Sequence, residues 1–182
     1  WDSSCWDSGF PFGEICVYWP TIEFRNVGFT VGNLKATAVP PPPPVLGQVD
    51  GNGVLTLNVG ASAGARNLMV GEINETVIID RVGNAIQISM FGHSQTFSGV
   101  TAIQIADMGS GSDFVDVRAS VATPLEVHFG TGNDRLRYLG SGAVTAFGDD
   151  DDDRLEAGSA DDHLFGGAGD DRLDGGNGND TA

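Results

Sequence analysis

Near its end the chain reads Gly166-Gly-Ala-Gly-Asp-Asp-Arg-Leu-Asp174, and this nine-residue pattern occurs four times in unbroken register between residues 148 and 182. Each copy has an aspartate at its sixth position, and the first three copies have a leucine at the eighth. The aspartates are Asp153, Asp162, Asp171 and Asp180, and the leucines are Leu155, Leu164 and Leu173. A strict short period of this kind predicts a repeated structural unit in which one apolar side chain per repeat faces inward.

Earlier copies of the pattern are less regular. Phe129-Gly-Thr-Gly-Asn-Asp-Arg-Leu-Arg137 fits well, with Asp134 at the sixth position. Residues 138–147 follow with one extra residue, and Val144 stands where an aspartate is expected. Gly109-Ser-Gly-Ser-Asp113 is a further partial copy.

These segments resemble the RTX, or hemolysin-type, calcium-binding nonapeptide, G-G-x-G-x-D-x-U-x, in which U is a large apolar residue. The resemblance is strong over residues 129–182 and weak over 109–116. It implies an all-β fold, a parallel β-helix or β-roll solenoid, that binds several calcium ions.

The chemistry of the pattern agrees with that implication. Glycines at positions one, two and four allow turns with positive φ, which direct carbonyl oxygens toward a common point, and the aspartate adds a carboxylate oxygen. Calcium takes six to eight such oxygens. The predicted metal-ligating residues are Asp134, Asp153, Asp162, Asp171, Asp180, Gly130, Gly132, Gly167, Gly169, Gly176, Gly178 and Asp151.

In the family two nonapeptides form one coil, so aspartates two repeats apart lie in one stack. The resemblance therefore places Asp153 with Asp171 on one side and Asp162 with Asp180 on the other, with one ion between each pair. Asp134 extends the first stack if the extra residue near Tyr138 is bulged out, and Val144 leaves a weak or empty site above Asp162.

Two copies depart from the glycine pattern. Asp149 and Asp151 replace the second and fourth glycines of the first copy, within a run of five aspartates that either adds ligands or forms a solvated turn. Ala157 and Ala160 replace glycines in the next copy, which predicts strain there.

Short runs with period-two alternation of apolar and polar residues fill most of 51–129, such as Leu55, Leu57 and Val59, and no helix is indicated. We predict degenerate solenoid strands in 47–128, before the calcium-binding β-roll of 129–182. The alternative is a small separate sandwich.

Five prolines, Pro40 to Pro44, separate an N-terminal arm, residues 1–39, from the rest, and we assign 40–46 as a polyproline linker. The arm is aromatic and is expected to contain one or two strands around Ile22–Val31. Its two cysteines, Cys5 and Cys16, predict a disulfide in an oxidising compartment; the alternative is two unpaired buried thiols.

The formal net charge of −16, from 25 acidic and 9 basic residues, argues against nucleic acid and anionic membranes as partners. No apolar run is long enough to insert into a membrane. The first residue, Trp1, indicates a processed N-terminus, so we expect a protein that is secreted or held at the cell surface.

Catalysis is not expected. His93, His128 and His163 have no metal-binding spacing, and no hydrolase motif is present. A polysaccharide-active β-helix enzyme is the remaining catalytic alternative.

The sequence therefore predicts an extracellular calcium-binding structural protein. In the first interpretation residues 1–39 add strands to a neighbouring copy, and head-to-tail contacts of this kind build a fibre or matrix. In the second, the arm caps its own solenoid, and the chain is a calcium-stiffened adhesin module or accessory domain of a larger secreted protein. Cell-surface or matrix polysaccharide is the other partner considered.

Overall fold

The computed structural model describes residues 4–7, 14–18, 21–24, 42–66 and 74–182, and the chain divides into two compact units, Trp1–Pro40 and Pro41–Ala182. The first unit contains an antiparallel sheet of three strands in the order β1 (Ser4–Asp7), β2 (Glu14–Tyr18) and β3 (Thr21–Phe24). The first two of these strands were not predicted. The expected strand residues from Val27 to Val31 lie outside the described residues.

The register of β1 and β2 places Cys5 opposite Cys16. The side chains of this hairpin lie outside the described residues, so the disulfide stays a prediction.

The second unit consists of two sheets that face one another. The seven-stranded sheet has the order β16-β14-β12-β10-β6-β7-β8, and the six-stranded sheet has the order β15-β13-β11-β9-β5-β4. The strands of the first are β6 (Thr76–Val82), β7 (Ala85–Met90), β8 (His93–Ser98), β10 (Phe114–Val117), β12 (Arg135–Tyr138), β14 (Arg154–Glu156) and β16 (Arg172–Asp174). Those of the second are β4 (Gly47–Val49), β5 (Val54–Leu57), β9 (Ala102–Ile105), β11 (Leu125–His128), β13 (Val144–Asp150) and β15 (His163–Ala168).

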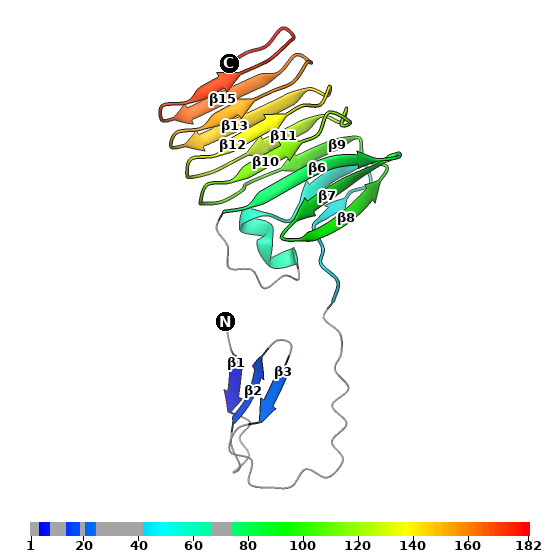
Figure 1. Cartoon of the computed structure of the whole chain (residues 1–182), viewed down its shortest axis with the longest axis vertical. Helices are drawn as coiled ribbons and strands as arrows, with labels where there is room; N and C mark the ends of the chain where they lie inside the picture. Colours follow the sequence, from blue (N-terminus) through cyan, green and yellow to red (C-terminus); the bar gives the residue numbers. More distant parts are fainter. Residues whose placement is uncertain (1–3, 8–13, 19–20, 25–41, 67–73) are drawn as a thin grey trace. The chain divides into compact units, whose positions relative to one another are not determined.

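From β9 onward the chain winds as a solenoid. Each coil contributes one strand to each sheet, and every new strand pairs in parallel with the strand of the preceding coil. Figure 1 shows these strands stacked one above the next up to β15. The predicted all-β solenoid is therefore confirmed, and residues before and after Phe129 lie in the same two sheets.

The core lies between the sheets, where the predicted inward-facing residues are buried. The alternating positions of β5 and β7 are enclosed, as are Leu155 and Leu164 of the repeats, while Leu173 is half-buried. The buried aromatic side chains and most of the buried leucines and isoleucines precede residue 139; beyond it the buried hydrophobic residues are only Val144, Ala146, Leu155 and Leu164 among those described. The C-terminal coils therefore gain less hydrophobic stabilisation than the N-terminal coils.

The N-terminal end of the solenoid is covered by elements that interrupt the coil pattern. Strand β4 pairs antiparallel with β5, and β7 and β8 form an antiparallel hairpin on β6. A 3-10 helix, η1 (Gly60–Arg66), lies between β5 and β6 in the sequence. The expectation of no helix is wrong for this segment, because its small residues form a compact turn without the apolar period that marks an amphipathic helix.

Candidate metal centre

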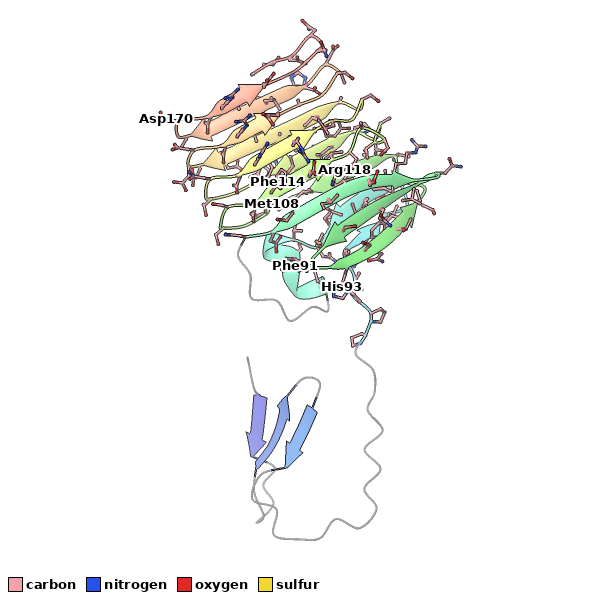
Figure 2. All side chains as sticks on the ribbon, in the orientation of Figure 1. Phe91, His93, Met108, Phe114, Arg118 and Asp170 are labelled. Atoms are coloured by element: carbon pink, nitrogen blue, oxygen red, sulfur yellow. The ribbon has the colours of Figure 1, made fainter. Side chains whose placement is uncertain are left out.

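One edge of the solenoid carries a column of acidic side chains, which lie just before β6, β10, β12, β14 and β16 of the seven-stranded sheet. The backbone N–H of Asp113 donates to Asp134 Oδ1 at 2.6 Å, that of Asp134 to Asp153 Oδ1 at 2.8 Å, and that of Asp153 to Asp171 Oδ1 at 2.9 Å. At the N-terminal end of this series the N–H of Glu75 donates to Asp113 Oδ1 at 2.6 Å. We call these five residues the acidic column; the exposed Asp170 marks its edge of the solenoid in Figure 2.

The column leaves carboxylate oxygens buried without a partner. Asp113, Asp134 and Asp153 are at most 3% exposed, and the Oδ2 atom of each lacks a hydrogen bond. Loss of hydration raises the pKa of Asp134 to about 7, and those of Asp113 and Asp153 to about 6; the neighbouring carboxylates of the column add to each shift. An unpaired buried carboxylate is costly, so this column requires either protons or cations.

The glycine-containing turns at both edges of the solenoid have the backbone conformation that the glycine pattern predicts. All six predicted glycines adopt positive φ: Gly130, Gly132, Gly167, Gly169, Gly176 and Gly178. A Cβ atom on Gly132 would overlap the carbonyl oxygen of Gly111, and one on Gly169 would overlap that of Asp151. Backbone oxygens of one coil therefore lie directly against the turn of the next coil, where only glycine leaves room.

Asp149 and Asp151 take the same backbone conformation as the glycines they replace, with φ of 73° and 76°. Their carboxylates reach back to the preceding coil and accept from the N–H groups of Gly130, at 3.3 Å, and Gly132, at 3.1 Å. Asp151, a predicted ligand, therefore lies beside the turn of the preceding coil. Asp150 is exposed, as expected of a solvated turn.

The opposite edge has a shorter stack. Asp162 N–H donates to Asp180 Oδ1 at 3.0 Å, and Val144 N–H donates to Asp162 Oδ1 at 2.7 Å. Val144 adds no carboxylate, so only one acidic pair is formed here. Ala157 and Ala160 are not among the described residues with positive φ, and the predicted strain is not observed.

The structure brings together the predicted aspartates in the two expected stacks, with Asp134 in the first. Sequence reasoning did not assign two members of the column. Asp113 had a signal, because Gly109 and Gly111 precede it at the spacing that Gly130 and Gly132 have before Asp134. Glu75 had none, since no glycine-rich turn precedes it and it lies 38 residues before its partner in the column.

The donor set fits calcium. Its side-chain donors are carboxylate oxygens, and unpaired buried oxygens lie at successive levels of the column. No group of three His, Cys, Asp or Glu side chains in the described part of the chain is close enough to hold a metal alone, so an ion here also requires backbone carbonyl oxygens. Hard oxygen ligands from both sources are what calcium prefers. When bound, calcium supplies the positive charge that neighbouring carboxylates lack.

These stacked turns and carboxylates define a calcium-binding β-solenoid. Residues 147–182 match the RTX calcium-binding nonapeptide repeat in 4 copies, so this segment is an array of RTX repeats. The resemblance seen in the sequence is thereby confirmed for these residues, together with the expectation that the array binds several calcium ions. No curated protein and no solved structure matches the chain. The coils of Asp113 and Asp134 lie outside the matched segment.

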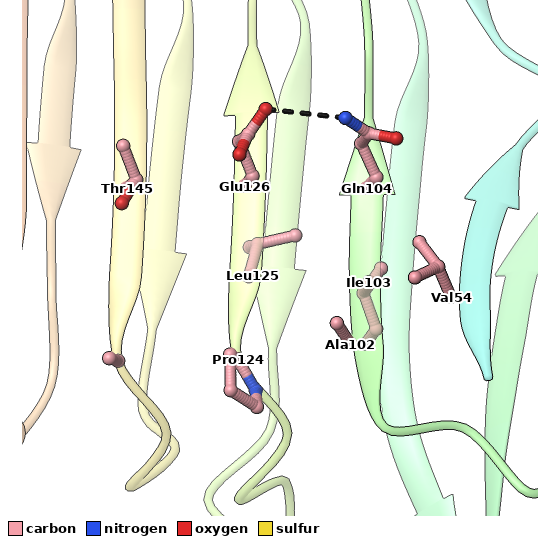
Figure 3. A pocket seen from close by; sticks show the side chains of 9 residues that line it. Val54, Ala102, Ile103, Gln104, Pro124, Leu125, Glu126 and Thr145 are labelled. Atoms are coloured by element: carbon pink, nitrogen blue, oxygen red, sulfur yellow. Dashed lines mark hydrogen bonds between the residues drawn. The ribbon is translucent and has the colours of Figure 1, made fainter. Parts of the chain in front are cut away.

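The remaining candidate groups do not form a second centre. His93 and His163 are exposed, and His128 stacks on Phe147 at 4.1 Å. A shallow groove of about 360 Å³ crosses the outer face of the six-stranded sheet, where Gln104 donates to Glu126 at 3.3 Å (Figure 3). Glu126 is the only acid among the described residues that line the groove. This lining lacks the pair of carboxylates that glycoside hydrolysis uses.

The raised pKa values predict that pH acts on stability in opposite directions with and without calcium. In the metal-free protein the folded state binds protons more tightly than the unfolded chain, whose aspartates titrate near 3.8. The contribution of the column to stability is then greatest at low pH and is lost as pH rises through about 6 to 7. With calcium the ligands must be deprotonated, so stability increases over the same range.

Urea unfolding between pH 4.5 and 7.5, in metal-free buffer and in millimolar calcium, measures both slopes. Asp134→Asn should flatten the metal-free slope, whereas Asp150→Asn, at an exposed position, should leave it unchanged. Slopes of the same sign in the two buffers would contradict the assignment.

Proposed function

We propose that this protein is an extracellular calcium-binding structural protein whose C-terminal coils stack stably only with calcium, and whose N-terminal arm joins one copy to the next. The observation that supports it most directly is the buried acidic column with its unpaired oxygens. Beyond residue 139 the described strands bury only Val144, Ala146, Leu155 and Leu164, too little to offset the conformational entropy of ordering these coils. Calcium between coils supplies the missing stabilisation.

The compartment follows from the same chemistry. Extracellular calcium is abundant enough to fill modules of modest affinity, and RTX repeats are typical of extracellular proteins. No helix in the described part of the chain has the length and apolarity needed to cross a membrane. Secretion or display at the cell surface is part of the proposal because of the calcium-binding repeats.

Assembly through the arm is the finer part of the proposal. The arm has its own three-stranded sheet with β1 and β3 at its edges. Edge strands offer unpaired backbone groups to which another sheet can add.

A second candidate, a calcium-stiffened binding module, is favoured by a different observation. Strands β4, β7 and β8 already cover the N-terminal end of the solenoid, so the unit is closed there by its own residues. In this case the chain works as a single particle that presents its sheet faces to a cell-surface or matrix polysaccharide.

Electron microscopy and circular dichroism, with millimolar calcium and then with excess chelator, test the proposal. We expect fibres in calcium, loss of part of the β signal in chelator, and no fibres from a variant that lacks residues 1–39. Monomers in calcium that still lose β signal in chelator would favour the binding module. Fibres formed by the shortened variant would exclude the arm as the linking element.

A further inference from the structure

The first level of the acidic column differs from the others because the chain itself supplies a cation there. Glu75 is 3% exposed and Arg66 is 2% exposed, and Arg66 Nη1 lies 2.5 Å from Glu75 Oε1. Glu75 occupies the place that an aspartate takes in the later coils, since its N–H donates to Asp113 Oδ1. A buried carboxylate of the column is therefore neutralised by a guanidinium.

Several contacts hold Arg66 in this place. It is the last residue of η1, and its carbonyl oxygen accepts from Val45 N–H at 2.9 Å. Gly60, at the start of η1, donates its N–H to Glu75 Oε2 at 3.2 Å. The guanidinium carbon lies 4.6 Å from the ring centroid of Phe91, at the end of β7 (Figure 2). Phe91 has a φ of 51°, a conformation that costs energy in a non-glycine residue and is retained where the surroundings require it.

The later levels of the column have no buried cationic side chain like that of Arg66 in the part of the chain that the structure describes. None of the ion pairs among the described residues includes Asp113, Asp134 or Asp153, and each of these keeps an unpaired buried oxygen. Hydrophobic burial decreases along the same direction, because only four of the buried hydrophobic residues among those described lie after residue 139. Internal charge compensation and a substantial core thus coincide at the N-terminal end.

We propose that the buried guanidinium of Arg66 takes the place of calcium at the first level of the acidic column, so that the N-terminal coils fold without metal and calcium adds the later coils to them. The inference rests on the proposed calcium function and extends it. It divides the solenoid into a metal-independent base, residues 45–66 and 74–105, and a metal-dependent extension that contains the RTX array, residues 147–182. Calcium then lengthens a preformed template and does not fold the whole solenoid at once.

Hydrogen exchange of the full-length chain, with and without calcium, tests the division. We expect amides of β5, β6 and β7 to exchange within about threefold of the same rate in both conditions, and those of β14 and β16 to exchange on the order of a hundredfold faster without calcium. Loss of protection in both regions on calcium removal would overturn the inference but keep the calcium function. No response in either region would overturn both.

Two variants test the role of the charge. Arg66→Met leaves Glu75 buried and uncompensated, so exchange in the base without calcium should accelerate on the order of a hundredfold. Arg66→Met combined with Glu75→Gln removes both charges and should recover most of that loss. Arg81→Met is the matched control, because Arg81 is exposed and its Nε donates only to Gly83 O.

The double variant shows whether Arg66 stabilises the base through its charge or through its packing on Phe91. Recovery of protection supports a guanidinium that acts as a cation for Glu75. Exchange as fast as in Arg66→Met alone would show that Arg66 acts through its packing on Phe91, and would overturn the proposal. The wild-type measurement stands even if Arg66→Met fails to fold.

Discussion

Asp153→Asn is expected to lower bound calcium by about two ions per chain, because the Asp153 carboxylate lies between those of Asp134 and Asp171 in the acidic column. Asparagine keeps the size of the side chain and an oxygen that accepts from Asp134 N–H, so the loss comes from charge. We expect a stability loss in calcium of at least about 3 kcal/mol, as for substitutions that remove a metal.

Equilibrium dialysis with elemental analysis counts the ions, and urea unfolding in calcium measures the stability. Asp180→Asn should lose only about one ion, since Asp180 pairs with Asp162 alone. Asp150→Asn makes the same change of charge at an exposed residue three positions away and should bind as much calcium as wild type. Undiminished binding by Asp153→Asn would exclude the column as the calcium site.

The regular part of the solenoid was predictable because its period is constant. Asp153 and Asp171 are 18 residues apart, or two nonapeptides, and alternating strands such as Leu125–His128 indicated which side chains face inward. These features depend on local spacing, which the sequence displays directly.

The rest depends on contacts that have no fixed spacing. The separation along the column is 38 residues between Glu75 and Asp113, then 21, and then 19 before it reaches 18. The hairpin of β7 and β8 is inserted into the first coil and accounts for the longest interval. No sequence pattern links Arg66 to Glu75, because the pair is a tertiary contact between the last residue of η1 and the residue before β6.

The position of each cation along the column has a physical reason. At the N-terminal end a covalently attached guanidinium remains in place at any calcium concentration. At the repeats the cations must bind from solution, so the fraction of molecules with a folded extension increases with calcium concentration. The same fold thereby combines a permanent base with a ligand-dependent extension.

Gly132→Ala is expected to destabilise the calcium-loaded protein by more than about 4 kcal/mol, the range reserved for severe backbone conflicts. Gly132 has a φ of 119°, and an added Cβ would overlap the carbonyl oxygen of Gly111 in the preceding coil. The coils would have to separate, which would disrupt the turn that contributes oxygens to the metal sites.

Three further glycines separate the cost of a positive φ from the cost of the overlap between Cβ and the preceding coil. Gly83 has a φ of 62° but open space around it, so Gly83→Ala should cost about 1 kcal/mol from conformation alone. Gly140 lacks positive φ, but a Cβ there would overlap Val121 O, so Gly140→Ala isolates the steric conflict. Gly51 has neither constraint and should change stability by less than about 0.5 kcal/mol. If Gly132→Ala costs no more than Gly83→Ala in urea unfolding, successive turns do not approach as closely as the metal sites require.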